Sequence, residues 1–244
     1  MERAMTTYSK RMILALCLGG LAGCGGADET HEDHHTDNHT AGHETAPEPD
    51  DGLAIEGLMG TISEMAVSRA LSPRMGRFAQ CFAERYDDLD VVGGRIRFSF
   101  RLKTDGTVKW VFPQASTIGD RQTEACLVDV AQGTRFERPR GGEAEFTWPL
   151  AFDAPDDIRP PVNWDAARAE DAVAAHRSEV RSNCGRGPFM VTAYVSPGGE
   201  VKAAGVSTTE QTSSQGLDCV ATAVAEWTMP DPGSYLAKVT FELP

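Results

Sequence analysis

Residues 96–109, IRFSFRLKTDGTVK, carry the pattern on which the fold prediction rests. Apolar and polar side chains alternate from Ile96 to Leu102, which is the period of a strand with one buried face. Asp105-Gly106 then favours a tight turn, and a second short apolar stretch begins at Val108. These residues therefore predict an antiparallel hairpin.

A second hairpin of the same kind follows 93 residues later. Residues 189–195 alternate with period two, and Pro-Gly-Gly at 197–199 provides the turn. The same shift places Cys219 on Cys126, and it needs no gap from Gly94 to the end of the chain. One offset kept over so long a stretch predicts an internal repeat.

Each hairpin lies between two segments of helical period. Downstream, apolar residues recur every three to four positions around Cys126 and Cys219. Upstream, one apolar stripe surrounds Cys81, where Ser72-Pro73 predicts the N-cap and first turn, and another leads to Cys184. A last strand closes each unit. We therefore predict an α+β chain of two tandem helix-strand-strand-helix-strand repeats, each a small antiparallel sheet packed on helices with one internal disulfide.

Four cysteines belong to this folded body: Cys81, Cys126, Cys184 and Cys219. They allow three connectivities, of which the repeat symmetry favours Cys81 with Cys126 and Cys184 with Cys219. Closing loops of this length would stabilise each unit by about 4 kcal/mol in the chain-entropy model. The alternatives are free buried thiols or a four-cysteine metal site, although the close C-x-x-C pairs usual for zinc are absent from the sequence.

The N-terminus has the features of a bacterial lipoprotein signal peptide. Three basic residues precede an apolar run at 12–22, which is too short to span a bilayer, and LAGC at 21–24 resembles the lipobox. Acyl chains such as palmitate on Cys24 would then anchor the protein in the lipid bilayer without a spanning helix. An ordinary secretory peptide is the alternative. We expect a location in the cell envelope, at the outer membrane of a Gram-negative bacterium.

The segment after Cys24 predicts a disordered, acidic, His-rich tether. From Gly25 to Gly57 it has ten acidic residues, five histidines and neither Lys nor Arg, so it cannot bury enough apolar surface to fold. Removal of residues 1–23, with three basic residues and one acidic residue, takes the net charge from −13 to −15. Such a charge disfavours nucleic acid as a partner.

The tether histidines are candidate metal ligands. Residues 31–35, HEDHH, match the H-E-x-x-H pattern of zinc proteases, but that motif works on a buried helix, which a polar tether cannot supply. A flexible chain can still bind Zn²⁺ or Cu²⁺ weakly, and the ligands would be His31, His34, His35, His39 and His43. Otherwise the histidines are incidental to a hydrophilic linker.

Residues 172–184, AVAAHRSEVRSNC, resemble the first helix of the TonB C-terminal-like domains of myxobacterial envelope proteins, the AgmX/PglI type. Asp105-Gly106, Cys126 and the FERP stretch at 136–139 match the later part of that pattern, and the second repeat keeps it. The resemblance covers both repeats and implies a fold more firmly than a function. The chain lacks both the usual tyrosine after the first cysteine and a proline-rich rod. The resemblance therefore does not imply an energy-coupling role like that of TonB itself.

The predicted organisation has five segments: signal peptide 1–23, lipidated Cys24 and tether 24–57, first repeat 58–153, linker 154–161 and second repeat 162–244. No nucleophile elbow, phosphate loop or dinucleotide fingerprint occurs in the sequence, and His176 falls on an inner helix stripe, where a packed histidine is expected in preference to a catalytic base. Because each repeat needs its apolar residues for its own core, we expect no deep pocket.

We therefore expect a non-catalytic protein without a cofactor. Its tandem repeats would bind an unidentified envelope protein or peptide, by strand addition at an exposed sheet edge. A periplasmic lipoprotein that binds Zn²⁺ or Cu²⁺ through the tether is the alternative.

Overall fold

The structure is a computed structural model that describes residues 59–154 and 156–243. The predicted signal peptide, Cys24 and the five tether histidines lie outside the described residues. Residues 54–244 form one compact unit with the α+β architecture expected from the sequence. Within the described ranges, no helix is both long and apolar enough to cross a membrane.

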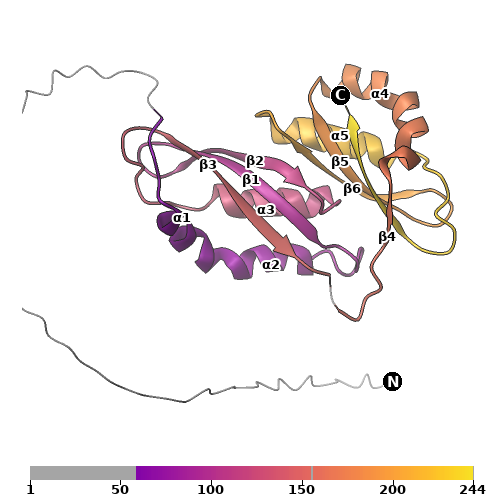
Figure 1. Cartoon of the computed structure of the whole chain (residues 1–244), viewed down its shortest axis with the longest axis horizontal. Helices are drawn as coiled ribbons and strands as arrows, with labels where there is room; N and C mark the ends of the chain where they lie inside the picture. The colour runs from indigo at the N-terminus through magenta and orange to yellow at the C-terminus, as the bar shows by residue number, and fades with distance from the viewer. Residues whose placement is uncertain (1–58, 155, 244) are drawn as a thin grey trace, which may run out of the picture. The chain divides into compact units, whose positions relative to one another are not determined.

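The first half of this unit, residues 59–153, is a three-stranded antiparallel sheet covered by helices on one face (Figure 1). Strand β1 lies in the centre, between β2 and β3. Helices α2 and α3 pack against each other along the sheet. The elements are α1 (Glu64–Leu71), a 3-10 turn (Ser72–Arg74), α2 (Met75–Ala83), β1 (Gly94–Leu102), β2 (Val108–Ser116), α3 (Arg121–Gln132) and β3 (Ala144–Phe152).

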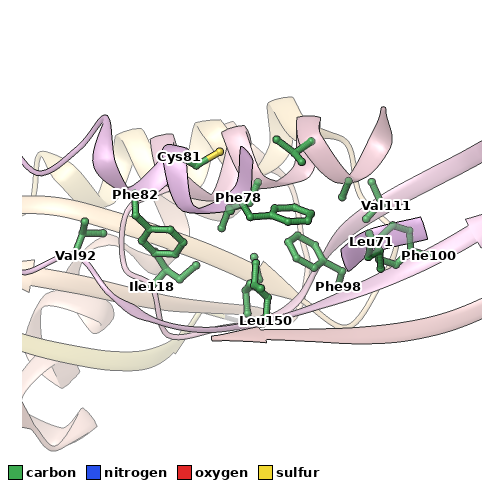
Figure 2. Packing of buried hydrophobic residues seen from close by; sticks show 14 of the residues in the cluster. Leu71, Phe78, Cys81, Phe82, Val92, Phe98, Phe100, Val111, Ile118 and Leu150 are labelled. Carbon is green, nitrogen blue, oxygen red and sulfur yellow. The ribbon is translucent and has the colours of Figure 1, made fainter. Parts of the chain in front are cut away.

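Aromatic side chains fill the core of the first half (Figure 2). The alternating residues from Ile96 to Leu102 point inward, as predicted, and all are almost fully buried. Phe78 of α2 packs on Phe98 with 6.4 Å between ring centroids. On the opposite face of β1, Arg95 and Arg97 are exposed. The period-two pattern thus separates an aromatic core from a charged, open sheet face.

The second half, residues 162–243, has a four-stranded sheet in the order β4-β7-β5-β6. The prediction of an antiparallel sheet is incomplete here, because β4 pairs with β7 in parallel. This short strand forms where the chain leaves the linker and runs beside the start of β7. The elements are β4 (Val162–Trp164), a 3-10 turn (Ala166–Ala169), α4 (Glu170–Cys184), β5 (Phe189–Val195), β6 (Val201–Thr208), α5 (Ser214–Ala225) and β7 (Ala237–Leu243).

Corresponding elements of the two halves keep the offset of 93 residues. Helix α3 begins at Arg121 and α5 at Ser214, and their ends at Gln132 and Ala225 are separated by the same number. Both hairpins have a register shift at the equivalent position. The tandem-repeat origin of the two halves stays a prediction, but their local geometry matches closely.

The hydrogen bonds at the two hairpin turns keep the same offset of 93 residues. The Phe136 N–H donates to the Gly106 carbonyl at 2.9 Å, and the Met229 N–H donates to the Gly199 carbonyl at 2.8 Å. Gly106 and Gly199 both have positive φ, and a Cβ on either would lie within 2.3 Å of a backbone oxygen. Only glycine therefore fits both turns.

The predicted start of the first helix is wrong. Helical structure begins at Glu64, where the Ser63 side chain accepts a hydrogen bond from the Ala66 N–H. Ser72 is the C-cap of α1 and not the N-cap of the next helix; it begins a 3-10 turn that joins α1 to α2. Pro73 explains this turn, since a proline inside a helix lacks its N–H and clashes with the preceding turn.

The two predicted disulfides are present, Cys81–Cys126 between α2 and α3 and Cys184–Cys219 between α4 and α5. The connection at 84–93 is longer than its counterpart at 185–188. Its apolar residues are buried, so it extends the first core: Leu89, Val91 and Val92.

Candidate functional site

In the sheet of the second half, β5 and β6 are largely buried on both faces. Phe189, Val191 and the other odd-numbered residues of β5 belong to the second core. The opposite face holds Thr192 and Tyr194, which are 1% and 0% exposed, and Tyr194 belongs to the core of the first half. The first half therefore covers part of this face.

Glu124 of α3 lies at the centre of the contact between the halves and is 0% exposed. The Ser116 hydroxyl donates to its Oε1 at 2.6 Å, and the Val206 N–H of β6 donates to its Oε2 at 2.8 Å. A Cβ on Gly205 would lie 2.4 Å from Oε1. The carboxyl group is thus held directly against the β6 backbone.

Two ion pairs and one hydrogen bond from a lysine surround Glu124. Asp120, the N-cap of α3, accepts two hydrogen bonds from Arg85, at 2.9 and 3.1 Å. Arg121 donates to Asp218 of α5 at 2.7 Å. Lys238 of β7 donates to the Gly93 carbonyl at 2.9 Å. Charged groups from both halves therefore meet around one buried carboxyl.

Burial shifts three pKa values in this contact. It raises the pKa of Glu124 to about 7, against the opposing effects of its two hydrogen bonds and of Arg121. It lowers the pKa of Lys238 to about 8 and raises that of Tyr194. Perturbed titratable groups occur in active sites and in structural interfaces alike. Since these lie between two packed halves, we assign them to the contact.

A cleft opens where the first half stops covering the second sheet. It has a volume of about 430 Å³, and its surface is mostly apolar. Residues 114–117 form its wall on the first half, and residues 188–190 and 207–209 with the end of β7 form the other side. The volume falls within the range of small-molecule and peptide sites.

The sequence led us to expect little room for a deep pocket, and it did not predict this open cleft. That expectation treated each repeat alone, whereas residues from both sides line the cleft. Ser116 and Ser207 link the two sides, since the Ser116 N–H donates to the Ser207 hydroxyl at 3.1 Å. The cleft therefore depends on how the halves pack, which a repeat-by-repeat reading cannot show.

Two polar groups of the cleft have no partner within the described chain. Gln114 lies at a bulge, where β2 has one residue more than β1, and its side-chain amide forms no hydrogen bond to described residues. Glu242 of β7 is exposed and forms no ion pair within the described ranges. Bulges commonly redirect a side chain beside a binding site.

The remaining candidates from the sequence divide into two groups. The expectation of a packed histidine is met only in part, since the His176 ring stacks on Trp227 at 5.1 Å between centroids but its side chain is 39% exposed. Among the described residues, no cluster of three or more His, Cys, Asp or Glu side chains could hold a metal ion. The lipidation site Cys24 and the tether histidines lie outside the described residues and stay predictions.

Sequence reasoning missed Glu124, although a signal was present. Glu124, Leu127 and Ala131 share the apolar stripe of α3, so a carboxyl group stands where an apolar residue is expected. Gly205 inside β6 was a second signal, since glycine in a strand often marks a close approach of another segment.

No family model, curated protein or solved structure gives a significant match to this chain. The resemblance to TonB C-terminal-like domains therefore stays a prediction.

Proposed function

We propose that this protein is a non-catalytic lipoprotein of the bacterial envelope, and that its body binds an extended peptide segment in the cleft between the halves. The observation that carries the proposal is the cleft itself, with apolar walls from both halves and the unpaired Gln114 amide at its side. An extended peptide offers apolar side chains for such walls and backbone amides for such polar groups.

The sheet edges favour peptide binding in the cleft over strand addition. The two outer strands of the first sheet each contain a proline, Pro113 in β2 and Pro149 in β3. Proline lacks the N–H that an added strand would need, and it commonly protects edges. On β6 the Val206 N–H is already bonded to Glu124. We therefore place the peptide in the cleft and not along these edges.

A matched pair of substitutions tests this site. Ala115 and Ala151 are both exposed and stand opposite Arg97 and Arg95 on β1, but only Ala115 lines the cleft. Peptides would be selected from a displayed library on residues 54–244, and their affinities measured by calorimetry. Ala115→Trp should weaken binding at least tenfold by filling the cleft, and Ala151→Trp should leave it unchanged.

Two results would overturn the peptide site. Selected peptides could bind the Ala115→Trp variant as well as the parent chain, or the library could yield no peptide that binds better than micromolar. A crystal structure of a selected peptide outside the cleft would count as the first result.

Membrane anchoring through Cys24 is a separate part of the proposal. It rests on the LAGC motif after the apolar run. Labelling with an acyl-chain precursor should mark the protein, and Cys24→Ala should release it to the soluble fraction. An unlabelled variant that remains in the membrane would contradict lipidation.

The five tether histidines favour metal binding as a second candidate function. We expect a synthetic peptide of residues 25–50 to bind Zn²⁺ or Cu²⁺ with only micromolar affinity, because ordering a flexible chain offsets much of the ligand energy. Calorimetry measures this affinity. Nanomolar binding with fixed stoichiometry, together with loss of a metal-dependent phenotype on deletion of residues 28–50, would make metal handling the leading function.

A further inference from the structure

We propose that the contact between the halves is a proton-dependent clamp, in which protonated Glu124 holds the halves together and ionised Glu124 weakens their contact. The clamp is a property of the contact itself. Its consequence for ligand binding rests on the function proposed above, because the same contact forms one side of the cleft.

The clamp follows first from the missing counterion of Glu124. Each carboxyl oxygen of Glu124 accepts one hydrogen bond from a neutral donor, and no described cation forms an ion pair with it. Asp120, one helical turn earlier, is also buried but is paired with Arg85. A buried carboxylate without a paired charge is costly, whereas a protonated carboxyl can keep the bond from the Val206 N–H and donate its own proton to the Ser116 hydroxyl oxygen, 2.6 Å from Oε1.

The charged groups that face Glu124 do not remove this cost. On its own helix, Asp120 is paired with Arg85, and Arg121 is bonded to Asp218 of α5. From β7, Lys238 lies near enough to interact electrostatically, but its amine donates to the Gly93 carbonyl. From β5, Tyr194 is neutral, and its hydroxyl points to the Val91 carbonyl at 3.4 Å.

The close fit links ionisation to separation of the halves. Because a single added carbon on Gly205 would lie 2.4 Å from Oε1, the carboxyl group has no free space on the side of β6. An ionised carboxylate gains hydration when that strand moves away. Protonation and packing of the halves are therefore thermodynamically coupled.

The direction and pH range of the coupling follow from the pKa values. The pKa of Glu124 is about 7 in the packed state and has the ordinary value of 4.5 when exposed. An acid with a raised pKa stabilises packing fully below about pH 4.5. This contribution falls as the pH rises, and it is lost once the pH is above about 7. A shift of this size corresponds to a change of roughly 100-fold or more in the packing equilibrium.

The cleft lies one hydrogen bond from the clamp. Ser116 donates its hydroxyl proton to Glu124 and its N–H to Ser207, and both serines line the cleft. Since the walls belong to different halves, a looser contact changes the width of the cleft. A peptide held there would bind more tightly near pH 5 than near pH 8.

Amide hydrogen exchange of Val206, measured by NMR on residues 54–244, tests the clamp directly. After correction for the intrinsic pH dependence of exchange, Val206 protection should fall roughly 100-fold between pH 5 and pH 7.5. Ala193, in the middle of β5, serves as the internal reference. Glu124→Gln keeps the shape and remains neutral, so its Val206 protection should not change with pH. Glu210→Gln, at an exposed glutamate, should behave as the parent chain does.

The test of the clamp does not depend on the Glu124→Gln variant alone. If Glu124→Gln fails to fold, carbon-detected titration of the Glu124 carboxyl in the parent chain still decides, and a pKa near 4.5 overturns the clamp. Constant Val206 protection in the parent chain does so too. Peptide affinity measured at both pH values separates the proposals, since a clamp without any peptide binding would refute only the proposed function.

Discussion

The two halves share one order of elements but bury their sheets differently. The first sheet has an aromatic core on one face and exposed arginines on the other, whereas β5 and β6 of the second are largely buried on both faces. Equivalent positions explain the difference: Trp110 and Phe112 on β2 correspond to Ala203 and Gly205 on β6. Small residues let α3 approach β6, whereas on β2 the rings of Trp110 and Phe112, with 5.4 Å between their centroids, occupy the corresponding positions. Side-chain volume at two positions thus distinguishes the first half, which covers, from the second half, whose sheet is covered.

The largest expected effect comes from the two cores. Phe98→Ala should destabilise the unit by about 3–5 kcal/mol, and Val191→Ala, at the equivalent position, by about 2 kcal/mol. Phe98→Ala should also increase hydrogen exchange in β5, since the second sheet depends on its cover. Denaturant unfolding and exchange on residues 54–244 measure both. If Val191→Ala loosened the first sheet to the same extent, the dependence would be mutual and the comparison would fail.

The disulfides should differ in local effect. Removing either pair by Cys→Ser should cost about 2–4 kcal/mol. Helix α4 buries few apolar side chains, and Cys184 is half-buried, whereas α2 buries Phe78 and Phe82 beside a fully buried Cys81. We therefore expect α4, and not α2, to lose exchange protection when its disulfide is removed.

Mild reduction followed by mass spectrometry gives an independent measurement of this difference. Cys184–Cys219 should open before Cys81–Cys126, because Cys81 is only 2% exposed. The opposite order of reduction would show that exposure does not distinguish the two bridges.

Glycine substitutions sharpen the comparison at the contact. Gly205→Ala should destabilise the unit by about 1–3 kcal/mol, because its Cβ would lie 2.4 Å from Glu124. Thermal unfolding of Gly205→Ala in the Glu124→Ala background should recover part of the loss. No recovery would mean that the backbone of β6, and not the carboxyl group, is the source of the strain.

The smallest effect is expected at Gly76 in α2. A Cβ there would meet no atom within 4 Å, and alanine is favoured over glycine in helices. Gly76→Ala should therefore stabilise the unit by about 0.5–1 kcal/mol. A destabilised variant in thermal unfolding would show that α2 needs glycine for a reason other than packing.

The sequence predicted what depends on local period and internal symmetry. The structure confirms both hairpins, the helices that carry cysteines and the two disulfides. Alternation and turn residues are local signals, and the constant offset related one half to the other. It did not predict α1 or β4, which form outside the repeated pattern. It also missed the cleft and Glu124, whose positions depend on contacts between residues about 80 positions apart, such as Glu124 with Val206.

The connection at 84–93 makes the order of the halves along the chain matter for folding. Its Val91 and Gly93 carbonyls receive Tyr194 and Lys238 from the second half. A chain is synthesised from its N-terminus, and N-terminal domains generally fold first. The half that needs no cover is thus complete when the half that needs one arrives. In the reverse order, the bare face of the second sheet would stay uncovered until the other half was made, with an unprotected strand edge that is a template for aggregation.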